Sequence, residues 1–283
     1  MEKNNLINKE KPQYRFVVAY ENEASGIIYY YKLKICDFKP NIFKCYKNKE
    51  QNIWLVITNR GNINMAAGVT YLRMISPENA KSIWINIGIA GHYNHKIGTI
   101  HNIKKVINSR NEKEVFYTNS IINDGINNAI AYNVEVEERN FKEKFYIYEM
   151  EALGFIKTTE RFCVRELICI LKIISDNKFR QPDDYIRTSI NLIKKNIEKI
   201  DRILAKYFLL AKEIKNNDNK LIEVIENRFH LTFTNKVRMK VILSKVVALK
   251  NDHYVMQKIQ ESKNLKELFI ILERIISEKR ISV

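Results

Sequence analysis

Hydrophobic residues in the first part of the chain fall in short runs rich in β-branched and aromatic residues, separated by polar and turn-forming residues. Runs of this kind predict β-strands. Four such strands are expected at residues 14–20, 26–35, 42–46 and 52–58. Residues 62–75 then place apolar side chains at helical spacing around two adjacent alanines, and residues 82–91 return to a buried-strand pattern that ends in glycine. Strand, helix and strand in this order predict an α/β sheet.

The hydrophobic pattern weakens between Lys104 and Lys144, where polar stretches give no clear element. Order returns with a helix expected from about Glu149 and an apolar run at residues 167–176 that predicts a central strand. Beyond Pro182, apolar residues recur every three or four positions, which is typical of amphipathic helices. These helices are expected from residue 183 and near 219–229, 235–250 and 264–280, with joints at 216–219 and 250–252.

The composition indicates a folded protein rather than a membrane or disulfide-rich one. A chain of 283 residues, 46% of them hydrophobic, can bury a substantial core in one large domain with an extension. No apolar run reaches the roughly 18 residues that a membrane span needs, and the first residues lack the apolar core of a signal peptide. We therefore expect a cytoplasmic protein. Its four cysteines lack C-x-x-C spacing, so reduced thiols are expected.

The net charge raises the question of an anionic partner. Forty-eight basic and 32 acidic residues give +16, a balance typical of nucleic-acid binding. From Arg187 onward 21 basic and 11 acidic residues give +10, so the first 186 residues carry the remaining +6. Abundant Lys, Asn and Ile, as encoded by an AT-rich genome, raise the charge equally well without a partner. A basic recognition helix at residues 231–245 is the nucleic-acid alternative, although lysines beside an apolar stripe more often form a solvated face.

Glycine-rich and acidic motifs follow several of the expected strands. Glycines at positions 88, 91 and 98 surround the end of the strand at 82–91, and a glycine turn precedes the helix at 62–75. The motifs YEMEA and IISD likewise lie where a strand meets a loop or a helix. Because ligands of open α/β sheets bind at the carboxyl ends of strands, these segments are expected to converge on one crevice.

Five motifs resemble the nucleoside phosphorylase and nucleosidase superfamily, in particular its methylthioadenosine and adenosylhomocysteine nucleosidases. They are FVVAYENEASGI (16–27), NRGNINMAAG (59–68), INIGIAG with the later IG (85–98), YEMEALGF (148–155) and LKIISD (171–176). Each motif is short, but their shared order over roughly residues 13–200 makes the resemblance specific. It implies a three-layer α/β/α sandwich with a mixed central sheet at residues 13–213, and residues 214–283 are expected to form an all-helical C-terminal extension.

The resemblance also assigns roles to three acids. Met150 would pack against the ribose, and Glu151 would accept hydrogen bonds from the 2′ and 3′ hydroxyls, which suits a carboxylate with two acceptor oxygens. Glu149 is then expected to be an acid at a helix N-terminus, favoured by the helix dipole. Asp176 would be the general acid that protonates or hydrogen-bonds purine N7, which requires a raised pKa. Without the resemblance, Asp176 is an ordinary capping or turn aspartate.

A further acid decides between hydrolysis and phosphorolysis. Glu23 resembles the family's acid after the first strand, which activates the attacking water in the hydrolytic branch, and Glu21 is the alternative two residues earlier. Phosphorolysis requires cations around phosphate, and Asn86 stands where many phosphorylases carry an arginine. This favours a nucleosidase, with Arg60 and Arg165 left as candidate phosphate ligands.

The base pocket implied by the resemblance consists of the backbone around Ala90 and Gly91, together with Ser175. Ile89 departs from the family because a small hydroxyl residue is common at that position. The segment between Gly98 and Tyr148 is also short for the family, which puts its usual aromatic over the base in doubt. Two aromatic residues of the FYIY stretch could stack on a base instead, although aromatics in a strand more often belong to the core: Phe145 and Tyr146.

Three histidines raise the possibility of a metal site. His92, His95 and His101 follow one another closely, but no helical pattern fixes their geometry and no cysteine or acid completes a tetrad. The resembling family uses no metal either. We therefore expect neither a metal nor another cofactor.

The predicted function is hydrolysis of the N-glycosidic bond of a purine nucleoside or thionucleoside, giving free base and sugar. One alternative is a phosphate-dependent phosphorylase on the same scaffold. The other is a catalytically silent nucleoside-sensing or nucleic-acid-associated protein that works through the basic tail. The expected partners are a small-molecule nucleoside and further copies of the chain, in a homodimer or higher homo-oligomer. No membrane contact is expected, and nucleic acid is not favoured.

Overall fold

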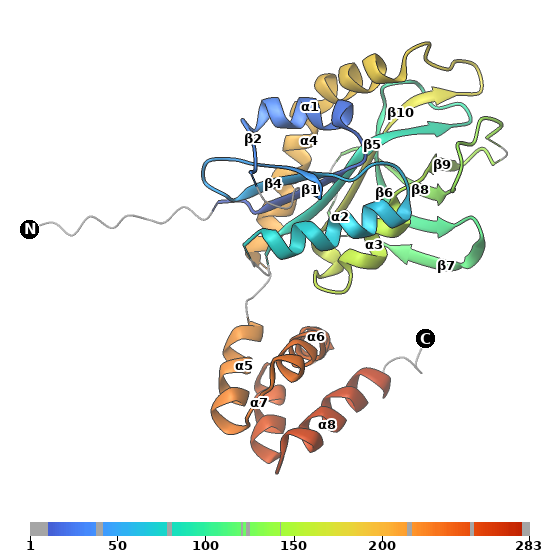
Figure 1. Cartoon of the computed structure of the whole chain (residues 1–283). Helices are drawn as coiled ribbons and strands as arrows, with labels where there is room; N and C mark the ends of the chain where they lie inside the picture. The colour runs from blue at the N-terminus through green and yellow to red at the C-terminus, as the bar shows by residue number, and fades with distance from the viewer. Residues whose placement is uncertain are drawn as a thin grey trace, which may run out of the picture. The chain divides into compact units, whose positions relative to one another are not determined.

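The computed structural model describes residues 11–37, 42–77, 81–119, 121–122, 125–141, 143–213, 217–249 and 252–278. The chain divides into two compact units, residues 1–213 and residues 214–283, each with its own hydrophobic core. The first unit combines a sheet with helices, whereas the described part of the second contains helices alone (Figure 1).

The sheet of the first unit is mixed. Its strands are β1 (Tyr14–Val18), β2 (Lys34–Ile35), β3 (Lys44–Lys47), β4 (Ile53–Ile57), β5 (Ile83–His92), β6 (Ile100–Asn108), β7 (Asn111–Tyr117), β8 (Asn127–Asn133), β9 (Tyr146–Glu149) and β10 (Ile168–Asn177). They follow the order β10-β6-β8-β9-β5-β1-β4-β3-β2, with β7 paired to β6. Because β5 also pairs with β10, the strands β5, β10, β6, β8 and β9 form a closed ring. The mixed α/β sheet predicted by the sequence is confirmed.

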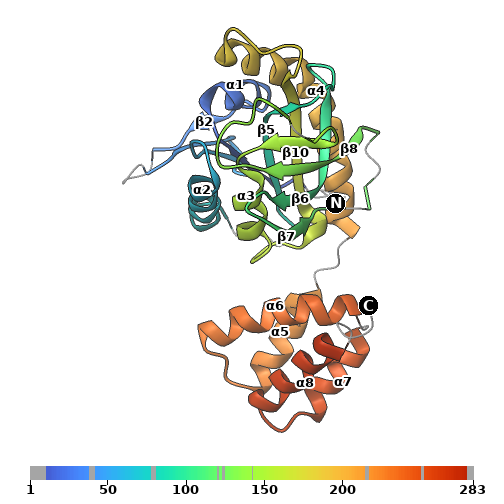
Figure 2. The same ribbon diagram turned by 90° about the vertical axis from the view of Figure 1, so that its right-hand side faces the viewer.

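Two pairs of helices cover this sheet. α1 (Glu21–Tyr30) packs along α4 (Tyr185–Glu213), and α2 (Asn62–Ile75) packs along α3 (Ala152–Thr159). Figures 1 and 2 both show α2 beside α3, with α1 and α4 across the sheet from them. A single 3-10 turn, Arg165–Leu167, leads into β10.

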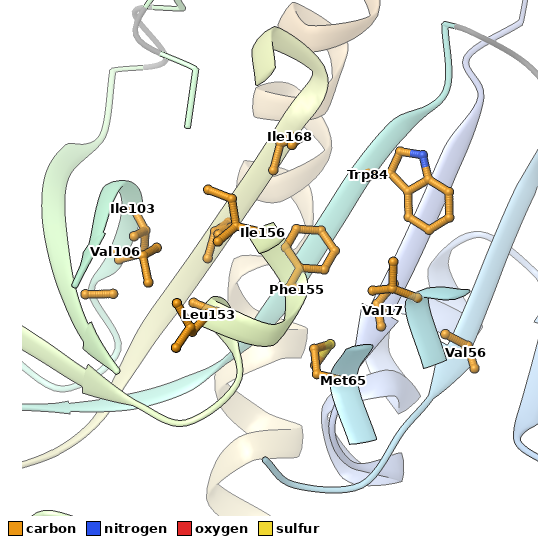
Figure 3. Close-up of a cluster of buried hydrophobic side chains, with 14 of the residues drawn as sticks. Val17, Val56, Met65, Trp84, Ile103, Val106, Leu153, Phe155, Ile156 and Ile168 are labelled. Carbon is orange, nitrogen blue, oxygen red and sulfur yellow. The ribbon is translucent and has the colours of Figure 1, made fainter. Parts of the chain in front are cut away.

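The apolar runs of the sequence become the inner strands. β1, β4 and β10 are buried along their whole lengths, as expected for strands covered on both faces. Side chains of α2 and α3 complete this core (Figure 3). Met65, Phe155 and Ile156 belong to one buried cluster with Val17 and Trp84 of the strands. This part of the core therefore lies between the sheet and the α2–α3 pair.

Residues 26–35 do not form the predicted strand. They make up the second half of α1, a turn and the two-residue β2. The isoleucines and tyrosines of this stretch have strand propensity, but the buried positions Glu23, Ala24 and Ile27 have helical spacing. The helix also has a local start signal, since the Glu23 carboxylate accepts the backbone N–H of Tyr20. Packing against α4 and the sheet therefore overrides the local propensity.

Two further predictions about the first unit need correction. The helix expected from about Glu149 begins only at Ala152, because Glu149 is the last residue of β9. The region after Lys104 that gave no clear element contains the end of β6 and the whole of β7 and β8. β7 has no buried residue, so its sequence lacks the hydrophobic alternation of a half-buried strand.

The second unit consists, in its described residues, of α5 (Asn217–Arg228), α6 (Phe233–Leu249), α7 (Asp252–Glu261) and α8 (Leu265–Glu278). The helices expected near 219–229, 235–250 and 264–280 are confirmed as α5, α6 and α8. α7 was not predicted: it begins at the end of the joint expected at 250–252, of which residues 250 and 251 lie outside the described part. The joint expected at 216–219 is helical from Asn217 onward, and residue 216 lies outside the described part. No helix among the described residues is long and apolar enough to cross a membrane.

The close crossing of α2 and α3 depends on Gly154. A β-carbon there would overlap the carbonyl oxygen of Asn62 and lie 2.8 Å from its carbonyl carbon. Because backbone atoms cannot rotate away, we expect Gly154→Ala to lower the free energy of unfolding by about 1–3 kcal/mol. Urea unfolding followed by circular dichroism measures this. Lys157→Ala, at an exposed position of the same helix, should change it by about 0.5 kcal/mol or less, and equal stability of the two variants would contradict the crossing.

Candidate active site

Glu23 lies in the first turn of α1 with its side chain directed toward the carboxyl half of β5. Its buried carboxylate accepts the backbone N–H groups of Ile89 at 2.9 Å and Tyr20 at 3.2 Å. Burial raises the pKa of Glu23 to about 7, and the negative charge of Glu151 adds to the rise. The Ile89 N–H and the Lys172 ammonium oppose it. A carboxylate with this pKa can accept and release a proton near neutral pH.

The alternative acid, Glu21, points elsewhere. Its side chain is 61% exposed and pairs with Lys44 at 2.7 Å. Of the two acids in this motif, the structure therefore brings Glu23 to the inner strands and leaves Glu21 in solvent.

Glu151 is the N-cap residue of α3 and is also buried. Its Oε1 accepts the backbone N–H of Gly61, at the start of α2, at 3.2 Å, and its Oε2 lies 3.7 Å from Nζ of Lys172. Burial raises the pKa of Glu151, whereas the Lys172 charge lowers it. Glu151 is thus held where the N-terminal ends of two helices meet, close to Glu23.

Glu149 has a different environment from Glu151. Its Oε2 accepts the backbone N–H groups of Glu151 at 3.0 Å and Ala152 at 2.7 Å, and its Oε1 accepts the amide of Asn133 at 2.7 Å. The prediction that Glu149 lies in the helix was wrong, because Glu149 ends β9. Its carboxylate nevertheless accepts hydrogen bonds from N–H groups at the N-terminus of α3.

Lys172 was missed by the sequence reasoning and occupies the centre of this cluster. It lies in the middle of β10 with its side chain 1% exposed, and Nζ is 3.1 Å from Oε2 of Glu149. Burial alone would lower the pKa of Lys172, but the three carboxylates of Glu149, Glu151 and Glu23 together raise it. The available signal was a single lysine inside the otherwise apolar run LICILKII, since a charge in a buried strand needs a partner.

Asp176 lies near the carboxyl end of β10, opposite Gly91 of β5. The Ser175 hydroxyl donates to its Oδ1 at 2.5 Å and also lies 3.3 Å from the carbonyl oxygen of Ala90. Burial raises the pKa of Asp176, and the Ser175 hydroxyl partly opposes this. A β-carbon on Gly91 would lie 2.9 Å from Oδ2, so this side of the carboxylate requires glycine. Asp176 therefore has the buried setting in which a carboxyl can stay protonated above its usual range.

The register of β5 sets the spacing between these acids. Oε1 of Glu23 lies 2.9 Å from where a β-carbon of Gly88 would be, whereas Oδ2 of Asp176 lies equally close to that of Gly91. Three residues of extended strand correspond to about 10 Å. Glu23 and Glu151 thus lie together, and Asp176 lies about 10 Å further along the same strand.

The other residues that the motifs single out lie around these acids. Met150 is half-buried between β9 and α3, next to Glu151. Ala90 is buried in the carboxyl half of β5, directly before Gly91. Ile89 donates its backbone N–H to Glu23, and its side chain has no hydroxyl group.

Phe141 is the aromatic residue beside Asp176, and sequence reasoning missed it. Its ring is fully buried, lies against Gly91 and packs edge-on to Tyr148 at 5.6 Å between ring centroids. Its φ of 43° is unusual for a bulky residue and marks a constrained backbone. The aromatics considered from sequence lie elsewhere: Phe145 is 62% exposed, and Tyr146 stacks on Tyr132.

The three histidines stack on one another instead of converging on a point. The ring centroids of His92 and His95 are 3.4 Å apart and those of His95 and His101 are 4.6 Å apart, with nearly parallel planes. Burial lowers the pKa of His92 to about 4 and that of His101 to about 4. Within the described ranges, no group of three or more His, Cys, Asp or Glu side chains has a geometry that could hold a metal ion.

One of the two candidate phosphate ligands lies far from the acids. Arg165 precedes β10 and is 3.4 Å from Glu160, at the opposite end of the strand from Asp176. A strand of ten residues separates them by about 30 Å. Arg60, in the turn before α2, is exposed but adjoins Gly61, which binds Glu151.

The first unit, a mixed sheet with its two helix pairs, has a fold similar to that of methylthioadenosine/adenosylhomocysteine nucleosidases of known structure. The 5′-methylthioadenosine nucleosidase of Arabidopsis thaliana superposes with a TM-score of 0.57 at 12% identity, over 70% of this chain and 97% of that one. A nucleosidase of Chlamydia trachomatis bound to MTA gives 0.52 at 20% identity, over 70% and 100%. The 5′-methylthioadenosine/S-adenosyl homocysteine nucleosidase of Campylobacter jejuni gives 0.53 at 14%, over 69% and 100%.

These similarities are structural. The sequence matches no protein-family model and no curated protein. The resemblance carried by the five motifs is confirmed at the level of the fold, and at such identities the comparisons extend no further than the fold.

Proposed function

We propose that this chain hydrolyses the N-glycosidic bond of a purine nucleoside or thionucleoside, releasing the free base and the sugar. The observation that carries the proposal is the grouping of Glu23 with Glu151, about 10 Å along β5 from Asp176. In this proposal the sugar lies between the two sets of acids. We also infer that residues 13–213 form a three-layer α/β/α nucleosidase domain, followed by residues 214–283 as a helical extension.

In this proposal Glu151 and Met150 bind the ribose. The Glu151 carboxylate accepts hydrogen bonds from the 2′ and 3′ hydroxyls, and Met150 packs against the sugar. Lys172 and the Gly61 N–H hold the carboxylate in place before the substrate arrives. Its negative charge also stabilises the positive charge that develops on the ribose as the bond to the base breaks.

Asp176 is the proposed general acid. Its raised pKa keeps a proton available for N7 of the purine, so the base leaves as a neutral species. Ser175 orients the carboxyl group through its hydrogen bond, and the backbone at Ala90 and Gly91 forms one wall of the base pocket. The ring of Phe141 closes the site beside this acid.

Glu23 is the proposed general base. It takes a proton from water, and the oxygen of that water bonds to the anomeric carbon as the base departs with the proton from Asp176. With its pKa at about 7, Glu23 is ionised in a large fraction of molecules at neutral pH and still basic enough to accept a proton.

The charges around Glu23 favour water over phosphate as the nucleophile. In the described part of the chain three carboxylates, Glu23, Glu149 and Glu151, surround the single ammonium of Lys172. That ammonium is already paired, so a phosphate dianion would meet three carboxylates, with the exposed Arg60 beside Gly61 as the remaining candidate cation. Phosphorolysis on this scaffold is the alternative, and its requirement for phosphate distinguishes it.

The proteins of similar structure indicate a substrate class to test first. One similar nucleosidase is described as bound to MTA and others are named for methylthioadenosine and adenosylhomocysteine. We propose a nucleoside of this class as the small-molecule partner. The chain would act on it in the cytoplasm as a homodimer or higher homo-oligomer, without a metal or other cofactor. Nucleic-acid binding through the basic tail is not favoured, because Lys236 and Arg238 pair with Glu226 and Glu273 of their own unit.

The direct test measures base release by the full-length protein. Adenosine, inosine, methylthioadenosine and adenosylhomocysteine are each incubated with and without phosphate, and free base is quantified by liquid chromatography. We expect base release from at least one purine nucleoside at the same rate in both conditions. Release only with phosphate would overturn hydrolysis in favour of phosphorolysis. No release from any substrate, together with steeply salt-dependent nucleic-acid binding, would favour the silent alternative.

A further inference from the structure

Lys172 is a buried cation to which the motifs assign no role, and the proposed chemistry uses it only to hold the Glu151 carboxylate. Its Nζ lies 3.1 Å from Glu149 and 3.7 Å from Glu151, and its side chain is 1% exposed. A lysine taken out of water at this depth is stable only when charged partners surround it. Since one carboxylate is enough to pair it, the presence of a second and a third needs explanation.

Glu149 anchors Lys172 rigidly. The Glu149 carboxylate is fixed by the N–H groups of Glu151 and Ala152 and by the amide of Asn133. Asn133 in turn accepts a hydrogen bond from Asn62 at the start of α2. This network ties the ammonium to β8, β9, α2 and α3, so its position does not depend on a substrate.

The ammonium also faces Glu23 across Gly88. The position of a β-carbon on Gly88 would be 3.5 Å from Nζ of Lys172 and 2.9 Å from Oε1 of Glu23. Glycine at this point of β5 lets the two groups interact without a side chain between them. Lys172 lowers the pKa of Glu23 and that of Glu151.

The buried titratable groups around this point come from four elements, and the exposed Tyr20 and Arg60 lie near them. α1 contributes Glu23, β9 contributes Glu149, the N-cap of α3 contributes Glu151 and β10 contributes Lys172 itself. β5 contributes only the backbone of Gly88 and the N–H of Ile89. Within the described residues, Lys172 is therefore the one cation among three buried carboxylates at this point.

We propose that Lys172, anchored by Glu149, is a positioning residue that keeps Glu23 and Glu151 ionised together in the site. The proposal rests on the proposed function for its kinetic consequence, because the base and the sugar-binding acid must both be charged in the same molecule. Two neighbouring buried carboxylates otherwise share a proton, since like charges at short range resist joint ionisation. A water-activating base and a ribose-binding acid can work side by side only if a fixed positive charge offsets that repulsion.

The kinetic test compares Lys172→Met and Lys172→Arg with the wild type over pH 5–10. Without the ammonium, the pKa of Glu23 rises, so the acidic limb of kcat/KM moves upward by at least about one pH unit. At pH 7 kcat/KM falls about 5-fold or more, whereas the arginine variant restores the wild-type limb. Lys157→Met is the matched control, because Lys157 also pairs with a glutamate but is 45% exposed, and its profile should not change.

A purely structural lysine would give a different result. Its loss would lower the amount of folded enzyme and the melting temperature, but the surviving enzyme would keep the wild-type pH midpoint. An unchanged midpoint in Lys172→Met would therefore overturn the proposal, and so would failure of arginine to restore a shifted midpoint.

A second measurement does not depend on activity. Carboxyl carbons of ¹³C-labelled glutamate are titrated by NMR in the full-length protein, with Glu23→Gln and Glu151→Gln identifying their signals. We expect the Glu23 midpoint to rise by at least about one unit in Lys172→Met and to return in Lys172→Arg. If the Glu23 midpoint shifts in Lys172→Met but the wild type releases no base, the proposed hydrolysis is wrong and this inference holds. If the wild type hydrolyses nucleosides but the midpoint does not shift in Lys172→Met, this inference is wrong and the proposed hydrolysis holds.

Discussion

Glu23→Gln is expected to lower kcat for base release by about 10²- to 10⁴-fold, the range usually contributed by a positioned general base. Glutamine retains the shape of the side chain and can still accept the N–H of Ile89, so the loss arises from its inability to take a proton from water. Steady-state assays of base release at pH 7 and 25 °C measure the effect, with circular dichroism confirming the fold of the variant.

Glu21→Gln is the matched control for this prediction. Glu21 is two residues away in the same helix turn, but its side chain is exposed and bound to Lys44. Its substitution should leave kcat within about twofold, because an exposed ion pair contributes little. Equal losses of kcat in the two variants would mean that the loss arises from a disturbance of helix α1 and not from removal of the Glu23 carboxylate.

The pH dependence follows from the same residue. The pKa of Glu23 is raised to about 7, mainly by burial, and the base acts in its ionised form. In the wild type, kcat/KM should therefore decline as the pH falls below about 7. This limb should be absent from the residual activity of Glu23→Gln.

Asp176→Asn is expected to lower kcat by a similar factor, about 10²- to 10⁴-fold, for a different reason. Asparagine can donate a hydrogen bond from its amide but has no acidic proton to give to the leaving base. Burial raises the pKa of Asp176, so the wild-type enzyme holds this proton at a higher pH than an exposed aspartate would. Activity that depends on this proton is retained at low pH and lost as the pH rises through the pKa of Asp176.

A change of leaving group separates acid catalysis from a structural effect. With a ribosyl substrate whose leaving group departs as a stable anion, protonation is unnecessary and Asp176→Asn should regain most of the wild-type rate. Asp184→Asn is the matched control, because Asp184 binds the Arg187 N–H at the start of α4 and asparagine caps a helix equally well. If Asp176→Asn were equally slow on both substrates, the carboxyl group would not be an acid catalyst.

The sequence predicted the elements whose local pattern agrees with their burial. β1, β4, β5 and β10 are continuous apolar runs because they are covered on both faces. α2 was predicted with the observed bounds, Asn62–Ile75, because its apolar positions follow a helical period. The order of the motifs then indicated the fold, because their acids and glycines lie where the strands end.

The failures share a physical cause, since each depends on contacts between distant parts of the chain. The isoleucines and tyrosines of α1 favour a strand locally, and only packing against α4 makes the segment helical. β9 is short and pairs with residues of β5 and β8 that no local pattern indicates. β7 is exposed and therefore lacks a hydrophobic pattern.

The motifs singled out the acids of the candidate site but not the residues that lie around them. Glu23, Glu151 and Asp176 came from motifs, whereas Lys172 and Phe141 act through partners far away in sequence. The sequence does contain a signal for Lys172, because an ammonium in an apolar strand requires carboxylate partners. Phe141 left none, because nothing in its polar surroundings shows that the ring turns inward to Gly91.

The most direct test of the central claim is a crystal structure of Asp176→Asn with methylthioadenosine, since this variant should bind the nucleoside without cleaving it. We expect both ribose hydroxyls to lie within hydrogen-bond distance of Glu151, purine N7 within reach of residue 176, and a water between Glu23 and the anomeric carbon. A nucleoside bound elsewhere on the chain, or with its sugar turned away from Glu23 and Glu151, would contradict the account.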